Sequence, residues 1–420
     1  MSFSFIHIAD IHLGRPFSDL SDFGDEMDIC INATKKSFER IVSLAIEKQV
    51  NFVLIAGDSF DDDEHDLSTK LLFIRNLKKL ADNGIKSYVI CGNHDPVEMY
   101  KKYESYFKFD KKYENFINIT GVTTDNFVAD FEPVEGVKIH SVSFLTEESN
   151  NQTKYLSQPD SKCFNIGLLH CDLDKTSSKY SPVTREDLRN LGYDYYALGH
   201  IHIPEIKENN IVYAGTHQGR SKKETDEHGC YYISVNDQND IKKEFIPTDY
   251  VRFYNLNIDC SDCENMNEIF IKISDKISDK NNEYFYEINL SGITKAYEEL
   301  NKSENILSDF LENYDGNIYK INNLTTPYID DNLIIEDEGV LGILANCFGE
   351  NSEINISEIY DNIANLHENI YKKLGLDSDS KEFFISALRE DKNNIIQNTK
   401  NELKMVCKEI YNLENANDKI

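Results

Sequence analysis

The first 91 residues alternate between short apolar runs and longer amphipathic segments, and this alternation limits the fold more than any other feature of the sequence. The apolar runs at 3–10, 50–58 and 85–91 are typical of buried strands. Between them, segments 33–48 and 67–83 place apolar residues at helical spacing. Strands that alternate with helices pair in parallel. We therefore expect an α/β fold with a central parallel sheet that is covered on both faces.

The pattern changes twice further along the chain. Strand-like runs continue to about residue 250, so we place a first domain at 1–250 and a small α+β domain at 251–330. Residues 331–420 are predicted to be helical, because Ile359, Ile363 and Leu366 recur at three- and four-residue steps. These helices can pack on one another or dock a partner, and both interpretations stay open.

The charge balance limits the ways in which this chain could bind nucleic acid. Its 44 Lys and Arg against 74 Asp and Glu give a net charge of −30, which opposes binding by bulk positive charge. Divalent ions and local basic patches, such as the one at 220–223, can offset this repulsion. No apolar run is long enough for a membrane helix, and the N-terminus lacks a signal-peptide pattern. We expect a cytoplasmic protein without membrane insertion.

The nine cysteines are scattered, and only one spacing resembles a known motif. Cys260 and Cys263 form a C-x-x-C, but no second pair follows at the spacing of a zinc site. Chance spacing is the simpler interpretation, and a redox or metal-binding role is the alternative.

Five short polar blocks follow predicted strands: "ADIH", "AGDSFD", "GNHD", "LLHCD" and "LGHIH". Each block alone is typical of a turn or of a hydrogen-bonded core residue. The carboxyl ends of parallel strands meet at one edge of a sheet, however, so the five blocks should lie together. Their Asp, His and Asn side chains suit Mn, Fe or Zn and are typical of a two-metal centre.

Spacing within the blocks suggests how ions could be shared. Asp10 and His12 are two residues apart, so strand alternation would direct both side chains to one ion, and His200 and His202 have the same spacing. The two oxygens of Asp58 could bridge ions about 3.5–4 Å apart. The amide oxygen of Asn93 adds a neutral ligand.

The series D-x-H, G-D, G-N-H-D, H and G-H-x-H resembles the calcineurin-like metallophosphoesterase superfamily. Within it, "SFIHIADIHLG", "CGNHD" and "YDYYALGHIH" resemble DNA repair nucleases of the SbcD type, and "YAGTHQGRSKKETDEHGCYYISV" resembles the YhaO-like branch. The resemblance covers residues 1 to about 251. It implies a metallophosphoesterase core of sheets flanked by helices at 1–250, a capping domain at 251–330 and a partner-docking helical region at 331–420.

The resemblance also implies the roles of individual residues. One divalent ion, expected to be Mn, would be held by Asp10, His12, Asp58 and His202. A second would be held by Asp58, Asn93, His170 and His200. His94 would contact the scissile phosphate, and Asp95 would orient His94. Asp61 stands where many relatives have a histidine, and the candidate substrate contacts are Asp61, Gln218 and Arg220.

These expectations describe a Mn-dependent DNA exonuclease, with endonuclease activity as an additional outcome, that hydrolyses phosphodiester bonds in DNA repair by a two-metal mechanism. The resemblance further implies a homodimer and an SMC-like ATPase partner. Two alternatives stay open. One is a metallophosphoesterase for a small phosphodiester or a nucleotide, which the acidic composition favours. The other is a non-catalytic scaffold for an ATPase.

Overall fold

The computed structural model describes residues 2–15, 17, 30, 32–61, 67–277, 284–302 and 317–328. The chain divides into two compact units. The first comprises Met1–Leu256, Asp279–Ile288 and Asn313–Lys320, and the second comprises Asn257–Ser278, Asn289–Glu312 and Ile321–Ile420. The helical region predicted at 331–420 lies outside the described residues. The predicted division at residues 250 and 330 stays a prediction.

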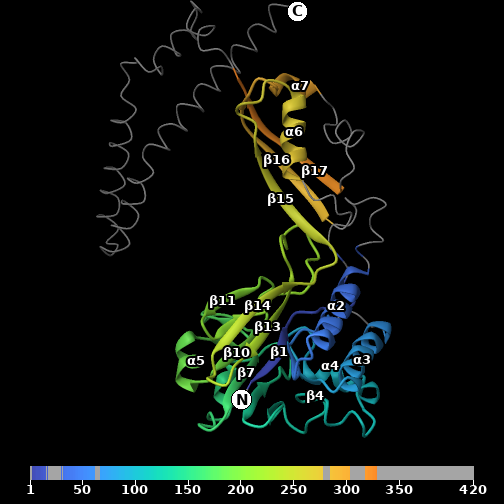
Figure 1. Cartoon of the computed structure of the whole chain (residues 1–420), viewed down its shortest axis with the longest axis vertical. Helices are drawn as coiled ribbons and strands as arrows, with labels where there is room; N and C mark the ends of the chain where they lie inside the picture. The colour runs from blue at the N-terminus through green and yellow to red at the C-terminus, as the bar shows by residue number, and fades with distance from the viewer. Residues whose placement is uncertain are drawn as a thin grey trace, which may run out of the picture. The chain divides into compact units, whose positions relative to one another are not determined.

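The first unit contains a six-stranded sheet with the order β14–β13–β1–β2–β3–β4 (Figure 1). Strands β1 (Phe3–Ile8), β2 (Phe52–Ala56), β3 (Lys86–Ile90) and β4 (Ile117–Ile119) are parallel. Strands β13 (Gly229–Val235) and β14 (Ile241–Pro247) are added antiparallel at the side of β1. Every residue of β2 is buried, which explains its continuous apolar sequence.

A second six-stranded sheet has the order β11–β12–β10–β7–β6–β5. Its parallel strands are β6 (Val137–Val142), β7 (Phe164–His170), β10 (Tyr195–Gly199) and β12 (Ile211–Tyr213). Its antiparallel edge strands are β5 (Val128–Phe131) and β11 (Glu205–Glu208). Every residue of β7 and of β10 is buried, because this sheet is also covered on both faces.

The two sheets form the middle of a layered core. Helices α2 (Ala33–Glu47) and α3 (Leu67–Asp82) cover the first sheet, where Phe38 and Phe73 join the core cluster of β1 to β3. The other face shares a core with the second sheet, which contributes Leu168. Helix α5 (Arg185–Leu191) covers the far side through Leu188 (Figure 1). The predicted class, sheets flanked by helices, is confirmed. The expectation of one central sheet was incomplete, because alternation does not reveal that a second sheet covers one face.

The remaining described elements are shorter or lie near the end of the described chain. They are α4 (Val97–Lys101), η3 (Glu104–Tyr106), η4 (Gln152–Tyr155), β8 (Asp172–Leu173) and β9 (Pro182–Val183) in the first unit, and α6 (Met266–Lys276) and α7 (Tyr297–Lys302) in the second. Strands β15 (Arg252–Asp259), β16 (Tyr284–Thr294) and β17 (Asn317–Pro327) form a third sheet in that order.

Two expectations from composition can be compared with these elements. Cys260 and Cys263 are buried free thiols, and burial raises the pKa of Cys260 to about 11, so the structure lends no support to a redox role. Across the described part of the chain, no helix has both the length and the apolar character required to cross a bilayer.

Candidate metal centre

The polar blocks form loops at the carboxyl ends of β1, β2, β3, β7 and β10, and backbone hydrogen bonds join these loops. The backbone N–H of Asp10 donates to the Gly57 carbonyl (3.1 Å), and that of His12 donates to the Asp58 carbonyl (2.9 Å). The Asp10 carboxylate accepts from the backbone N–H of His200 (3.0 Å). Segments 190 residues apart in the sequence are therefore held side by side.

Four of the predicted metal-binding residues have a left-handed backbone. The φ angles are 51° at Asp10, 45° at His12, 50° at Asp58 and 100° at His200. Such conformations cost about 1–3 kcal/mol each in non-glycine residues and cluster at functional sites. Because β1 ends at Ile8, Asp10 and His12 meet through a strained loop and not through strand alternation. The spacing argument reached the right pair for the wrong reason.

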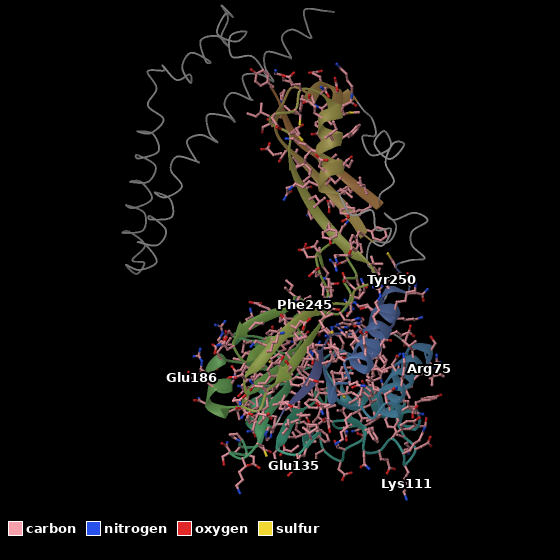
Figure 2. All side chains as sticks on the ribbon, in the orientation of Figure 1. Arg75, Lys111, Glu135, Glu186, Phe245 and Tyr250 are labelled. Atoms are coloured by element: carbon pink, nitrogen blue, oxygen red, sulfur yellow. The ribbon has the colours of Figure 1, made fainter. Side chains whose placement is uncertain are left out.

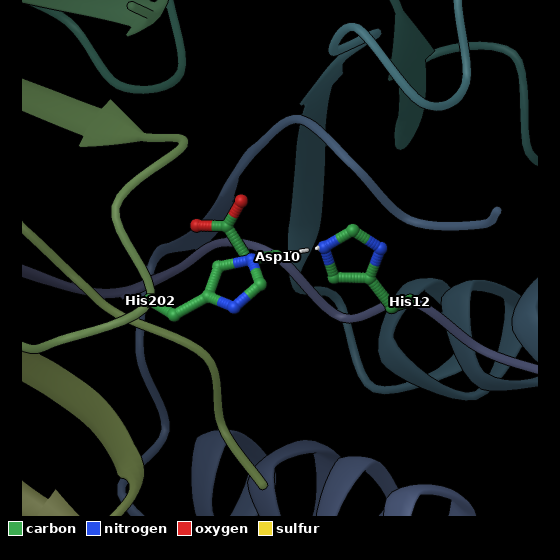
Figure 3. Close-up of side chains that lie close together, drawn as sticks. All are labelled: Asp10, His12 and His202. Atoms are coloured by element: carbon green, nitrogen blue, oxygen red, sulfur yellow. Dashed lines mark hydrogen bonds between the residues drawn. The ribbon is translucent and has the colours of Figure 1, made fainter. Parts of the chain in front are cut away.

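Two groups of side chains are each able to hold a metal ion. We call them the first triad, Asp10, His12 and His202 (Figure 3), and the second triad, Asp58, His170 and His200. Within each triad the ligand atoms lie within 4.8 Å of one another. Five of these six residues are buried or nearly so, and only His202 is substantially exposed.

Asp58 links the two triads through a carboxylate oxygen, and Asn93 adds an amide oxygen to the second triad. Oδ2 of Asp58 lies 3.2 Å from Nε2 of His170 and 3.9 Å from Nε2 of His12, so it reaches toward both groups. Oδ1 of Asn93 lies 3.0 Å from Nε2 of His170 and 3.0 Å from Nδ1 of His200. All seven residues predicted as metal ligands thus lie in one cluster.

The protonation of the first triad shows why it suits a cation. Nδ1 of His12 lies 3.0 Å from an Asp61 oxygen, and Nδ1 of His202 lies 2.6 Å from a Glu224 oxygen. A carboxylate only accepts, so each Nδ1 carries the proton and each Nε2 keeps its lone pair. These two Nε2 atoms face each other at 3.3 Å (Figure 3). Burial lowers the pKa of His12 to about 4, so His12 is neutral near pH 7. A metal ion bound between the two Nε2 atoms would use both lone pairs.

The second triad is arranged in the same way. Nδ1 of His170 donates to the Ala56 carbonyl (2.8 Å), and Nε2 of His200 lies 3.2 Å from an Asp172 oxygen. Nε2 of His170 and Nδ1 of His200 both face Oδ1 of Asn93. Burial disfavours charge on His170, but the Asp58 carboxylate outweighs it and raises the pKa of His170 to about 9. A proton and a divalent cation therefore compete for this position.

His94 lies beside the triads and is accessible. Its side chain is 42 % exposed, and its Nδ1 lies 3.1 Å from Oδ1 of Asp61. The same oxygen contacts His12, and Nε of Arg15 lies 3.2 Å from the other oxygen. Asp61 therefore holds two imidazoles, and only 13 % of its side chain is exposed. This geometry is that of a positioning group and not of a substrate contact.

Asp95 does not contact His94 in the way the sequence suggested. Its buried carboxylate accepts from the backbone N–H groups of Ser59 (2.8 Å) and Gly92 (2.7 Å) and from the Tyr100 hydroxyl (3.0 Å). The Asp95 side chain therefore joins the loop after β2 to the loop after β3. The orienting role predicted for Asp95 is therefore corrected. The carboxylate that faces His94 belongs to Asp61, because neighbours in a tight turn point in different directions.

Gln218 and Arg220, the other predicted substrate contacts, differ from each other. Gln218 is fully buried; its Nε2 donates to the Val251 carbonyl (2.6 Å), and its Oε1 accepts from the Tyr250 N–H (2.7 Å). We therefore no longer assign Gln218 to substrate. Arg220 is 4 % exposed, and its Nη2 lies 3.5 Å from Nδ1 of His202. Its Nε and Nη1 have no hydrogen-bond partner among the described residues.

Sequence reasoning missed Asp172 and Glu224, which face His200 and His202. Asp172 follows His170 by two residues, and Glu224 follows Arg220 by four, so neither belongs to a recognisable metal motif. Burial disfavours the charge on Glu224. The contacts with His202 and Arg220 outweigh burial and hold the pKa of Glu224 well below its usual range.

Comparison with known proteins agrees with the geometry of the fold and the triads. Residues 3–204 match the sequence model of the family described as Calcineurin-like phosphoesterase. Residues 3–204 therefore contain a calcineurin-like metallophosphoesterase domain. The predicted resemblance to this superfamily is confirmed.

Its relatives belong to the branch that the sequence suggested. The chain is 29 % identical over 293 residues to the "Uncharacterized metallophosphoesterase YhaO" of Bacillus subtilis, a match that covers 66 % of this chain and 67 % of YhaO. It is 28 % identical over 267 residues to the "DNA double-strand break repair protein Mre11" of Methanocaldococcus jannaschii, which covers 62 % of this chain and 65 % of that protein. The match to Mre11 of Sulfolobus acidocaldarius, at 30 % identity, covers only 49 % of that protein.

Solved structures add little beyond this. A dimetal phosphatase from Danio rerio aligns with 58 % of this chain and 96 % of its own at 12 % identity, with a TM-score of 0.36. A similarity this low carries no argument about function.

Proposed function

We propose that this protein is a Mn-dependent DNA nuclease subunit that hydrolyses phosphodiester bonds, as an exonuclease and with endonuclease activity as an additional outcome. The observation that carries the proposal is the convergence of two cation-binding triads beside one exposed imidazole, His94. The names of the Mre11 relatives favour DNA repair as the setting.

In this proposal the seven clustered residues hold two divalent ions, which when bound stabilise negative charge developing on the phosphate. The set of carboxylate, imidazole and amide ligands suits Mn. His94 is held at Nδ1 by Asp61, so its Nε2 is left to contact the phosphate and to protonate the departing sugar oxygen.

Arg220 is proposed to contact a phosphate oxygen of the substrate. It is a buried cation beside the first triad, and two of its donor groups have no described partner. The guanidinium places positive charge beside the first triad, where it would stabilise the negative charge of a bound phosphate. In the absence of substrate, the contact with Glu224 at 3.6 Å supplies part of the balancing charge.

The acidic composition favours a second candidate, a small phosphodiester or a nucleotide. The chain carries a net charge of −30, and exposed side chains of both signs, among them Arg75, Lys111, Glu135 and Glu186, lie on the outside of the first unit (Figure 2). A small substrate needs no extended basic surface. For DNA, we propose that a homodimer and an SMC-like ATPase partner, docked by residues 331–420, supply further contacts. The cytoplasmic location stays a prediction.

The test compares two substrates with the same purified protein. We expect Mn-dependent degradation of linear double-stranded DNA and of bis-p-nitrophenyl phosphate, both slowed about 10²- to 10⁴-fold in His94→Gln although metal binding persists. Hydrolysis of the small diester without any action on DNA, alone or with an ATPase partner, would select the second candidate. No hydrolysis of either substrate would favour the non-catalytic scaffold.

A further inference from the structure

We propose that Glu224 and Asp172 are positioning residues, and that each sets the metal affinity of a different triad. Glu224 acts through His202 on the first triad, and Asp172 acts through His200 on the second. The inference rests on the proposed function, because it requires divalent ions at both triads.

Glu224 fixes the ring of His202 from the side opposite the first triad. One carboxylate oxygen lies 2.6 Å from Nδ1 of His202, and the other accepts from the backbone N–H of Arg220 (2.8 Å). Nη2 of Arg220 lies 3.6 Å from Oε1 of Glu224, and this ion pair further restrains the carboxylate. Glu224 therefore keeps the proton of His202 on Nδ1 and directs the lone pair of Nε2 toward Asp10 and His12.

Asp172 does the same for His200 with the opposite ring nitrogen. Its Oδ2 lies 3.2 Å from Nε2 of His200 and accepts from the Ser178 hydroxyl (2.5 Å), and Nζ of Lys175 lies 2.8 Å from Oδ1. The side chain is 6 % exposed, so its orientation is constrained. The proton of His200 is therefore kept on Nε2, which leaves the lone pair of Nδ1 for the second triad.

The two carboxylates act on different positions although their histidines are separated by one residue. His202 belongs with Asp10 and His12, whereas His200 belongs with Asp58 and His170. A carboxylate behind a ligating imidazole makes the ligand more basic and fixes its direction, and its loss weakens metal binding about 10- to 100-fold. Each carboxylate should therefore control one ion and leave the other unchanged.

The test locates Mn in crystals of the full chain equilibrated at graded Mn concentrations. Anomalous scattering gives the occupancy at each triad separately, which a general loss of folding could not mimic. The variants are Glu224→Gln and Asp172→Asn, which keep size and one acceptor but remove the charge. The matched controls are Glu227→Gln and Asp174→Asn, exposed neighbours that pair with Arg252 and Arg185.

We expect Glu224→Gln to need about 10- to 100-fold more Mn for half occupancy at the first triad and to leave the second unchanged, and Asp172→Asn to show the reverse. The controls should match the parent protein. Equal weakening at both triads, or no weakening at either, would overturn the inference. If a variant does not fold, Glu224→Asp or Asp172→Glu, which displace the carboxylate by one methylene, should show the same selective loss, and failure to do so overturns it equally. If the parent protein binds no Mn at the triads, the proposed function itself fails.

Discussion

Replacing Asp61 by asparagine should slow phosphodiester hydrolysis about 10- to 100-fold. One Asp61 oxygen lies 3.1 Å from Nδ1 of His94 and 3.0 Å from Nδ1 of His12. Asparagine keeps the shape and one neutral acceptor, but it removes the charge that holds both rings. A hydrogen bond to a charged group contributes about 1.5–3 kcal/mol, and each 1.4 kcal/mol of lost transition-state stabilisation is tenfold in rate.

The assay separates the two histidines that Asp61 holds. Rates of bis-p-nitrophenyl phosphate hydrolysis at saturating Mn remove the effect of weaker metal binding through His12, so the remaining loss reports on His94. Arg15→Gln is the control, because Arg15 pairs with the same carboxylate but its side chain is 42 % exposed. It should retain nearly the parental rate, since exposed ion pairs contribute little.

A double variant shows whether Asp61 works through His94. If it does, Asp61→Asn combined with His94→Gln should be no slower than His94→Gln alone, because the carboxylate then has no ring to orient. A full sum of the two losses, or a parental rate for Asp61→Asn, would refute the reasoning.

Three further predictions follow from the geometry. Gly92→Ala would place a Cβ 2.1 Å from Oδ1 of Asp58, so we expect Mn binding measured by titration calorimetry to weaken at both ions; parental affinity would contradict this close approach. Chelation by EDTA should lower the melting temperature and Mn should restore it, since an ion at 100 times its dissociation constant stabilises the fold by about 2.7 kcal/mol; a melting temperature insensitive to Mn would argue against the site. Burial lowers the pKa of His7 from 6.5 to about 3, so below pH ~6.5 only the unfolded chain gains this proton and stability falls as the pH falls. Urea unfolding near pH 5.5 should show a loss of about 1.4 kcal/mol that is absent in His7→Gln, and identical pH profiles would refute it.

The strands and the site edge could be predicted from the sequence for a simple reason. Buried parallel strands must be apolar throughout, so β1, β2 and β3 stand out as runs whose ends are marked by polar residues. Once the strands are parallel, their polar ends must lie at one edge. The clustering of Asp10, Asp58 and Asn93, which follow β1, β2 and β3 of the first sheet, depends on little else.

The orientation of side chains within the loops could not be predicted in this way. Asp61 lies in the loop after β2 and Asp95 lies in the loop after β3, beside His94. Nevertheless, Asp61 contacts the His94 ring, whereas the Asp95 carboxylate accepts from backbone N–H groups such as that of Gly92. Glu224 reaches His202 from a loop 22 residues further along the chain. Such contacts depend on tertiary packing and on positive φ angles at residues other than glycine, for which local spacing carries no signal. The second sheet was missed for a related reason. The apolar sequence of a strand indicates that the strand is buried, but it does not indicate which element covers it.

The number of Mn ions bound by the purified chain and its variants tests the central claim most directly. Elemental analysis after equilibration with excess Mn and removal of unbound metal should give two ions for the parent protein and for His94→Gln. It should give about one ion for His12→Ala and for His170→Ala, since each loses a ligand of one triad. Fewer than two ions in the parent protein, or two ions retained in both triad variants, would contradict the account.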